Sequence, residues 1–385
     1  VQGIADAYQI PGLALAIVYK HGQTELGTWG TRSEDGSAVT VDTLFNISSC
    51  SKAFLGAALG IVIDDFAQGR NTIALPRGLS TLSWQTKLAD ILPGDWELSD
   101  PWESQKANLI DIVAHVSGMS SHDLSYKQND TALDITKIFR HLRSSHELRG
   151  KFHYYNQIHV VGAQVVTTLS GLHFTDFVKN RILKPLNMAR STYSIGSSGK
   201  QTGTLASAGG VISDIDESTS WLKLCLNDGV DLGTNETIIS RDALEQVSSA
   251  HSIIIGNPWG QLDRSVIGYR LGWCVFSSSG YVILHPSNVP GVTTITSAFV
   301  SDGVGIVVLS NAEGKGPALV EITFAIARKL LHLDELQVPT SALTRPLHAR
   351  RRRRGTPSHW LWYRLSRGLR GKRDALQKLA FQGSC

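Results

Sequence analysis

The stretch Phe45–Phe66 reads FNISSCSKAFLGAALGIVIDDF, and it decides the fold because the hydrophobic period changes within it. Residues 41–47 (VDTLFNI) have the composition of an extended segment. From Ser51 to Gln68 apolar residues recur every three or four positions, which predicts a long and mostly buried helix. Gly69 is suited to end that helix. The stretch therefore predicts a strand, a short polar turn and a buried helix.

Extended segments lie on both sides of this helix, towards the two ends of the chain. A buried strand is expected at 13–19 (LALAIVY), with a hairpin partner at 24–31. Strand patterns return after about residue 265, and an amphipathic helix is expected at 317–331. The expected late strands cover residues 268–275, 281–285, 293–300 and 305–310.

The middle of the chain shows helical periods separated by polar loops. The main expected helices cover residues 109–115, 135–142, 157–169, 174–182 and 214–226. This order predicts an α+β fold, an α/β sandwich with one antiparallel sheet flanked by helices and an inserted all-helical subdomain. We expect a catalytic domain over 1–340, with a sheet lobe of about 1–72 plus 206–340 and a helical lobe of about 73–205. The cleft between the lobes is the expected site.

The turn before the long helix contains Ser49-Cys50-Ser51-Lys52, an S-x-x-K motif found in β-lactamases and penicillin-binding proteins. A serine hydroxyl is a weak nucleophile until a neighbouring group takes its proton, and residues three apart share a helix face. The motif also occurs at Ser197…Lys200 and Ser220…Lys223, so alone it is weak. Of the three, only Ser49 lies between an expected strand and a long buried helix.

Two further stretches contain chemically suitable residues. Tyr154-Tyr155-Asn156 is the single Y-x-N in the chain, and a tyrosinate beside a lysine is suited to general base catalysis. The alternative is a pair of core aromatic residues at a helix start. His285 ends an expected strand and begins the turn in the stretch 284–291 (LHPSNVPG). A lone histidine there is more often structural, so its assignment depends on the other two motifs.

In this order and spacing, the three motifs resemble the serine β-lactamase-like and penicillin-binding-protein family. That family includes class C β-lactamases, D-alanyl-D-alanine carboxypeptidases and related esterases. The resemblance covers roughly residues 5–335, and residues 121–126 (SHDLSY) and 154–157 (YYNQ) look most like fungal members. Other similar blocks are 11–14 (PGLA), 42–45 (DTLF), 114–119 (AHVSGM), 184–188 (KPLNM), 208–210 (AGG), 271–273 (LGW) and 309–311 (LSN).

The resemblance implies a β-lactamase/transpeptidase-like fold and a role for each catalytic residue. Ser49 would attack an acyl carbonyl and form an acyl-enzyme, while Lys52 and Tyr154 would move its proton. His285 occupies the position where many members have Lys or His. The implied activity is that of a serine hydrolase acting on an ester, amide or lactam. The alternatives are an acyltransferase using the same residues, or a catalytically inactive binding protein of the same fold.

The resemblance also implies the substrate-binding groups. Asn156 would orient the substrate, and the N–H of Ser49 with an N–H near Asn288 would bind the oxyanion. Ser287 is a third expected substrate-binding residue, and it departs from the family, whose H-x-G members usually have glycine there. The neighbouring Pro286 lacks an N–H and is restricted to strand edges or bulges. These two departures are the main sequence argument for the inactive alternative.

Charge is unevenly distributed along the 385 residues. Twelve of the 37 lysines and arginines, but one of the 33 acidic residues, fall from Arg345 onward. The tail 341–385 is therefore expected to be basic and disordered, with an anionic surface as a candidate partner. The rest of the chain has a net negative charge, so we do not expect it to bind nucleic acid. Its expected partner is a small-molecule or peptide acyl substrate.

Several classes of protein find no support in the sequence. There is no H-E-x-x-H, no C-x-x-C, no Walker loop and no G-x-S-x-G, so we expect neither metal nor cofactor. No apolar run is long enough for a membrane span, which predicts a soluble chain. The chain begins with Val1, so a signal peptide could have been removed and the compartment stays open. The oligomeric state is equally open.

Overall fold

The structure is a computed structural model, and it describes residues 1–333 except 123–124, 128, 196–199, 202–204, 257–264 and 279. The expected tail at 341–385 lies outside the described residues, as does Ser197 of the second S-x-x-K motif. No described helix has the length and apolar character that crossing a membrane requires.

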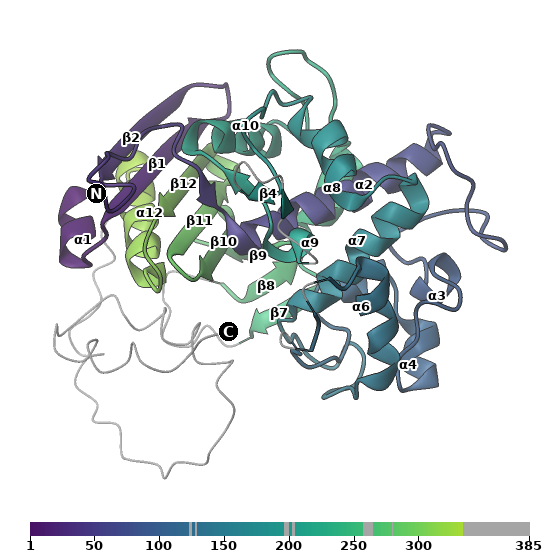
Figure 1. The fold of residues 1–385 in the computed structure, drawn as a ribbon. Coiled ribbons are helices and arrows are strands. Elements are labelled where there is room, and N and C mark those ends of the chain that lie inside the picture. The colour runs from purple at the N-terminus through teal and green to yellow at the C-terminus, as the bar shows by residue number, and fades with distance from the viewer. Residues whose placement is uncertain are drawn as a thin grey trace, which may run out of the picture.

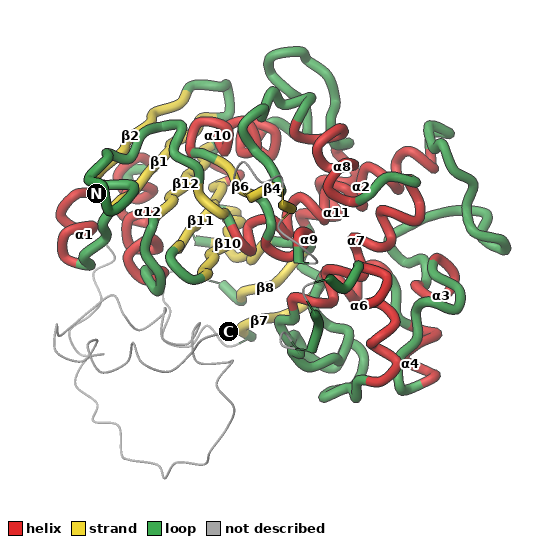
Figure 2. Tube along the Cα trace, in the orientation of Figure 1, coloured by secondary structure: helices red, strands yellow, loops and turns green. Residues whose placement is uncertain are grey.

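The centre of the described chain is an antiparallel sheet in the order β2-β1-β12-β11-β10-β9-β8-β7 (Figures 1 and 2). The early and late strands thus share one antiparallel sheet, as the sequence predicted, and the hairpin of the first two strands lies beside the last one. The strands of this sheet are β1 (Gly12–Tyr19), β2 (Thr24–Gly30), β7 (Ser252–Ile255), β8 (Ile267–Arg270), β9 (Trp273–Ser277), β10 (Tyr281–Val289), β11 (Val292–Phe299) and β12 (Val304–Ser310). Two small ladders join β3 (Phe45–Asn46) to β6 (Ile212–Ser213) and β4 (Ser194–Ile195) to β5 (Lys200–Gln201).

Helices cover both faces of this sheet. Side chains alternate along β1, so Ile17 belongs to the core that contains Leu319 on one face, while Val18 belongs to the core that contains Trp221 on the other. Because both faces are buried, β1 is apolar throughout. The first face is covered by α12 (Gly316–Leu330) with α1 (Gln2–Ala7), and the second by α10 (Ile215–Leu226) and the long helix α2 (Lys52–Ala67).

The remaining helices lie mainly on the side of the molecule away from α1 and α12 (Figure 1). They are α3 (Leu88–Ile91), α4 (Pro101–Lys106), α5 (Leu109–Val113), α6 (Ala132–Ile138), α7 (Asn156–Ser170), α8 (Phe174–Val178), α9 (Ala206–Gly209) and α11 (Arg241–Ser248). Of these helices, α7, α8, α9 and α11 contact α2, while α5 and α6 pack on α7. Short 3₁₀ turns are η1 (Ser48–Ser51), η2 (Phe139–His141) and η4 (Val300–Asp302), and η3 (Lys179–Leu183) is a π-helical turn.

One expected strand is wrong in detail. The segment 268–275 is two strands, β8 and β9, because the chain reverses at Leu271-Gly272. Gly272 has a φ of +104°, and a Cβ there would lie 2.5 Å from the backbone nitrogen of Ala53. The glycine lets this turn pack directly against the start of α2, which a hydrophobic period cannot reveal.

Other differences concern short elements. The extended segment 41–47 forms only the two-residue strand β3, since residues 41–42 lie in a turn. Helices α1 and α11 and strand β7 were not expected. Their sequences are too short for a hydrophobic period to identify them, and their tertiary neighbours decide their conformation.

Candidate active site

Ser49 lies in the 3₁₀ turn η1, which connects β3 to the long helix α2. Ser48, the residue before it, has a φ of +48°, a left-handed conformation that is uncommon for a side-chain-bearing residue. Its N–H donates to Asn46 Oδ1 at 2.7 Å, and Ser51 Oγ accepts from the N–H of Val211 at 3.0 Å. These contacts hold the turn at both ends, so the position of Ser49 is defined by its neighbours.

Three distant stretches of the chain meet at the Ser49 hydroxyl. Lys52 Nζ donates to Ser49 Oγ at 3.1 Å, and Tyr154 Oη donates to the same oxygen at 2.8 Å. Tyr154 lies two residues before Asn156, the first residue of α7, and Tyr155 is the N-cap of that helix. The structure therefore brings the S-x-x-K and Y-x-N motifs together around one oxygen atom.

The amine of Lys52 is held from several sides inside the protein. Its side chain is 0% exposed, and Nζ donates to Asn156 Oδ1 at 2.8 Å and to the backbone oxygen of Ala208 at 2.7 Å. Nζ also lies 4.7 Å from the centre of the Tyr154 ring. The acceptors on Ser49, Asn156 and Ala208 are all uncharged, an arrangement in which a proton can leave or return without breaking an ion pair.

The second half of β10 faces this turn. Leu284 is the last residue of β10 that pairs with β9, so residues 285–289 pair with β11 alone within the described sheet. Ser287 Oγ accepts a hydrogen bond from the N–H of Ser49 at 2.5 Å. The Asn288 side chain is used elsewhere, since its Oδ1 accepts from Thr293 Oγ1 at 3.0 Å and from the N–H of Gly314 at 2.6 Å.

His285 is close to the site but one layer behind it. Its ring is 3% exposed; Nδ1 is 2.8 Å from the backbone oxygen of Pro286, and Tyr269 Oη is 3.4 Å from Nε2. Among the described residues, no hydrogen bond joins this ring to Ser49 Oγ. Burial, followed by the charge of Lys52, lowers the pKa of His285 to about 3. The ring is therefore neutral, and Nδ1–H donates to the Pro286 oxygen.

A buried layer of rings beneath Tyr154 was missed by sequence reasoning. His115 is 1% exposed, and its ring centre lies 4.4 Å from that of Tyr154, 4.5 Å from that of His159 and 4.8 Å from that of Tyr269. The N–H of Tyr155 donates to His115 Nδ1 at 3.1 Å. The only sequence signal was the family-like block 114–119, which gave no role for the histidine.

Burial determines the protonation of this layer. Burial is the main cause that lowers the pKa values of His115 and His159 far below the usual histidine range. The nearby amine of Lys52 acts in the same direction on both pKa values. Both imidazoles are therefore neutral at pH 7.

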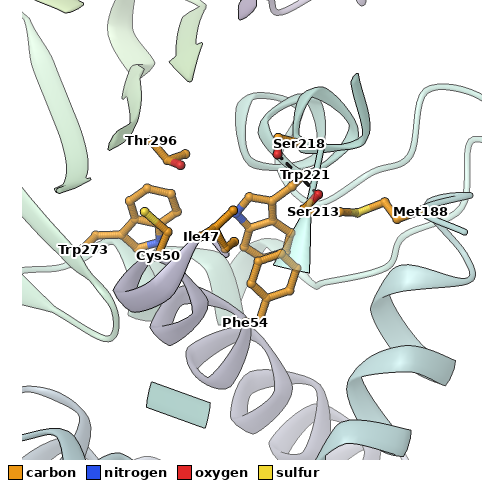
Figure 3. Close-up of a pocket in the computed structure, with 9 residues that line it drawn as sticks. All are labelled: Ile47, Cys50, Phe54, Met188, Ser213, Ser218, Trp221, Trp273 and Thr296. Atoms are coloured by element: carbon orange, nitrogen blue, oxygen red, sulfur yellow. Dashed lines mark hydrogen bonds between the residues drawn. The ribbon is translucent and has the colours of Figure 1, made fainter. Parts of the chain in front are cut away.

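Cys50, the residue after Ser49, points away from the site. Its Sγ donates to the backbone oxygen of His285 at 3.3 Å, and burial raises the pKa of its thiol. Figure 3 shows the Cys50 side chain among the residues that line a small internal pocket, which include Trp221 and Trp273. A protonated, buried thiol is a poor nucleophile, so Cys50 is not suited to that role.

No three His, Cys, Asp or Glu side chains gather as a possible metal site in the part of the chain that the structure describes.

Comparisons with known proteins found a matching family model and several relatives. A family model described as Beta-lactamase matches residues 1–330. The "Unguisins hydrolase ungD'" of Aspergillus campestris (strain IBT 28561) is 24% identical over 341 residues, which cover 81% of this chain and 60% of that protein. The "Unguisins hydrolase ungD" of Aspergillus violaceofuscus (strain CBS 115571) is 20% identical over 345 residues, covering 79% and 59%. The chain thus spans about three-fifths of the length of these curated relatives.

Solved structures share the fold. The octameric penicillin-binding protein homologue from Pyrococcus abyssi matches with a TM-score of 0.68 at 18% identity, over 86% of this chain and 76% of that chain. A class C β-lactamase from Rhodobacter sphaeroides matches with a TM-score of 0.65 at 17% identity, over 86% and 97%. The predicted fold, an antiparallel sheet flanked by helices of the β-lactamase/transpeptidase type, is confirmed.

Proposed function

The chain belongs to the β-lactamase family, and we propose that it is a serine hydrolase that forms an acyl-enzyme on Ser49. One observation carries the proposal. A single hydroxyl oxygen lies 3.1 Å from the Lys52 amine and 2.8 Å from the Tyr154 phenol. Both groups can exchange a proton with Ser49 Oγ, and both distances are within the range required of a general base.

The reaction then has two halves. In the first, Ser49 Oγ bonds to the acyl carbon, its proton passes to the Lys52–Tyr154 pair, and the leaving group departs with that proton. In the second, water gives a proton to the same pair and its oxygen attacks the acyl carbon, which releases Ser49 Oγ to recover the proton. The neutral layer of His115, His159 and His285 adds no further positive charge beneath the pair.

The substrate side of the site is formed by Asn156 and the second half of β10. Lys52 Nζ donates to the Asn156 oxygen at 2.8 Å, which holds this side chain beside Ser49, and its proposed role is to orient the acyl substrate. The Asn288 side chain is committed to Thr293 and Gly314, so its proposed contribution is a backbone N–H. The proposed substrates are small-molecule or peptide acyl compounds with an ester, amide or lactam carbonyl.

A fluorophosphonate probe and a fluorescent penicillin test the proposal directly. We expect at least one to label the full chain covalently, and Ser49→Ala to abolish the label because it removes the attacking oxygen. Ser220→Ala is the matched control, since Ser220…Lys223 is a second S-x-x-K motif and lies on α10. Labelling that persists in Ser49→Ala, or that Ser220→Ala removes, would rule out Ser49 as the nucleophile.

A substrate panel then sharpens the activity. It should contain an aryl ester, a lactam, a D-amino-acid amide and unguisins, since the two fungal relatives are named as hydrolases of unguisins. Product formation that depends on Ser49 defines the acyl class. An inactive binding protein is the second candidate, because the Ser287 hydroxyl already accepts the hydrogen bond of the Ser49 N–H that would otherwise bind the oxyanion. A chain that no probe labels and that turns over no panel member would favour it.

A further inference from the structure

The backbone N–H of Ser49 already has a hydrogen-bond partner inside the protein. In a serine acyl-enzyme this amide is suited to bind the carbonyl oxygen that becomes an oxyanion. Here Ser287 Oγ accepts that N–H at 2.5 Å, and the Ser287 side chain is 5% exposed. A side-chain oxygen of the protein therefore stands where the oxygen of an acyl group would bind.

The sheet register places this hydroxyl against the turn. Ser287 pairs with Thr294 and His285 with Thr296, so the side chains of both β10 residues point to the same face. That face is the one covered by η1, because the Cys50 thiol reaches the His285 backbone oxygen at 3.3 Å and Thr294 Oγ1 donates to the Ile47 oxygen at 3.2 Å. The contact follows from the pairing of β10 with β11 and requires no movement of a loop.

We propose that the Ser287 hydroxyl is an internal cap on the oxyanion-binding amide of Ser49, which an acyl substrate must displace to bind. The inference rests on the proposed function and makes Ser287 a specificity-determining residue. Displacing the cap costs one hydrogen bond whether the incoming oxygen is a neutral carbonyl or an oxyanion. The cap therefore weakens binding of substrate and transition state alike.

This equal effect gives a kinetic signature. A substitution that changes the binding free energy of substrate and transition state by the same amount changes KM and leaves kcat unchanged. A neutral carbonyl replaces one neutral hydrogen bond by another and gains little, so it competes poorly with the cap. The oxyanion forms a charge-assisted hydrogen bond, which is roughly twice as strong, so the capped amide still stabilises the transition state. Substrates with strongly polarised carbonyl groups are favoured over weakly polarised ones.

The test compares Ser287→Gly, Ser287→Ala and Ser287→Thr in the full chain, with p-nitrophenyl butyrate and nitrocefin as probes. Ser287→Gly is expected to raise kcat/KM roughly three- to tenfold through a lower KM, the factor that one net hydrogen bond provides. Ser287→Ala removes the oxygen but keeps Cβ, so a smaller rise is expected. Ser287→Thr keeps the hydroxyl, and its kcat/KM should lie below those of both. Ser297→Ala, on β11, is the matched control. The Ser297 Oγ donates to the Ile306 oxygen at 2.9 Å and not to the Ser49 turn, so this variant should show no increase in kcat/KM.

The outcomes separate this inference from the proposed function. If Ser287→Gly and Ser287→Ala lower kcat/KM, the hydroxyl donates to the substrate, and the cap is excluded. Unchanged kinetics in both variants, with labelling still dependent on Ser49, would likewise exclude the cap and leave the serine hydrolase in place. If neither the parent nor Ser287→Gly reacts with any probe at Ser49, both proposals fall.

Discussion

The buried carboxylates of the helical periphery and the buried bases around Ser49 are held in opposite ways. Away from the site, Asp65 meets Arg181, Asp111 meets Arg149, and Asp214 meets Arg190. Each of these ion pairs joins two segments distant in the chain, and the carboxylate is the buried partner. At the site, Lys52 donates to the uncharged oxygens of Ser49, Asn156 and Ala208.

The difference follows from what each group has to do. An ion pair stabilises the charged forms of both partners and so opposes proton transfer. That suits a structural contact, where charge should not change. Around Ser49 the lysine, the phenol and three neutral imidazoles are held by packing and by neutral acceptors, so a proton can move within the site. The comparison predicts that substitutions at the site change rate and that substitutions at the periphery change stability.

The largest expected effect is that of Lys52→Met on the rate of Ser49 acylation. Loss of a general base should slow labelling by roughly 10³-fold. The unfolding free energy should change by less than about 2 kcal/mol, because removing a buried polar amine offsets the loss of a donor by the Asn156 and Ala208 oxygens. Ser49 Oγ still accepts from Tyr154. Probe labelling and urea denaturation measure the two effects. A variant that labels at the parent rate would remove Lys52 from the mechanism.

Asp214→Asn should give the reverse result. Asp214 is 0% exposed and is the N-cap of α10. Its carboxylate accepts hydrogen bonds from the Arg190 side chain and from the N–H of Glu217. Breaking a buried pair is strongly destabilising, but the Arg190 side chain is 45% exposed, so we expect a loss of about 2 kcal/mol. Labelling per folded molecule should match the parent. A rate change at unchanged stability would contradict the comparison.

The last prediction concerns the dependence of stability on pH. Histidine in the unfolded chain has a pKa near 6.5, whereas burial lowers the pKa values of His115, His159 and His285 in the folded chain. As the pH falls below 6.5, these histidines therefore bind protons in the unfolded chain but not in the folded one, which favours unfolding. The unfolding free energy should fall by at most about 1.4 kcal/mol per pH unit for each of these histidines.

His159→Phe isolates one of these contributions. It should reduce the dependence of stability on pH between 7.5 and 5, measured by urea denaturation across that range. His21→Gln, in an exposed turn, is the control that should keep the parent dependence. If His159→Phe shows the parent dependence as well, the imidazole of His159 is not kept neutral by burial.

Much of the fold could be predicted because its signals are local. The apolar run of β1, the helical period of α2 and the late strands are each encoded within a few consecutive residues. The turn at Gly272 could not be predicted, since it requires the position of Ala53 in another element. The helices α1 and α11 were likewise hidden, because their amphipathic patterns are short.

The sequence by itself determined that Ser49, Lys52 and Tyr154 are present at family-like spacing, since motifs are a property of residue order. Only the tertiary structure decided what surrounds them. It placed His285 behind the site against Tyr269, turned the Asn288 side chain towards the loop before α12, and set the Ser287 hydroxyl on the Ser49 amide. These positions depend on strand register and burial, which arise only when distant segments pack together.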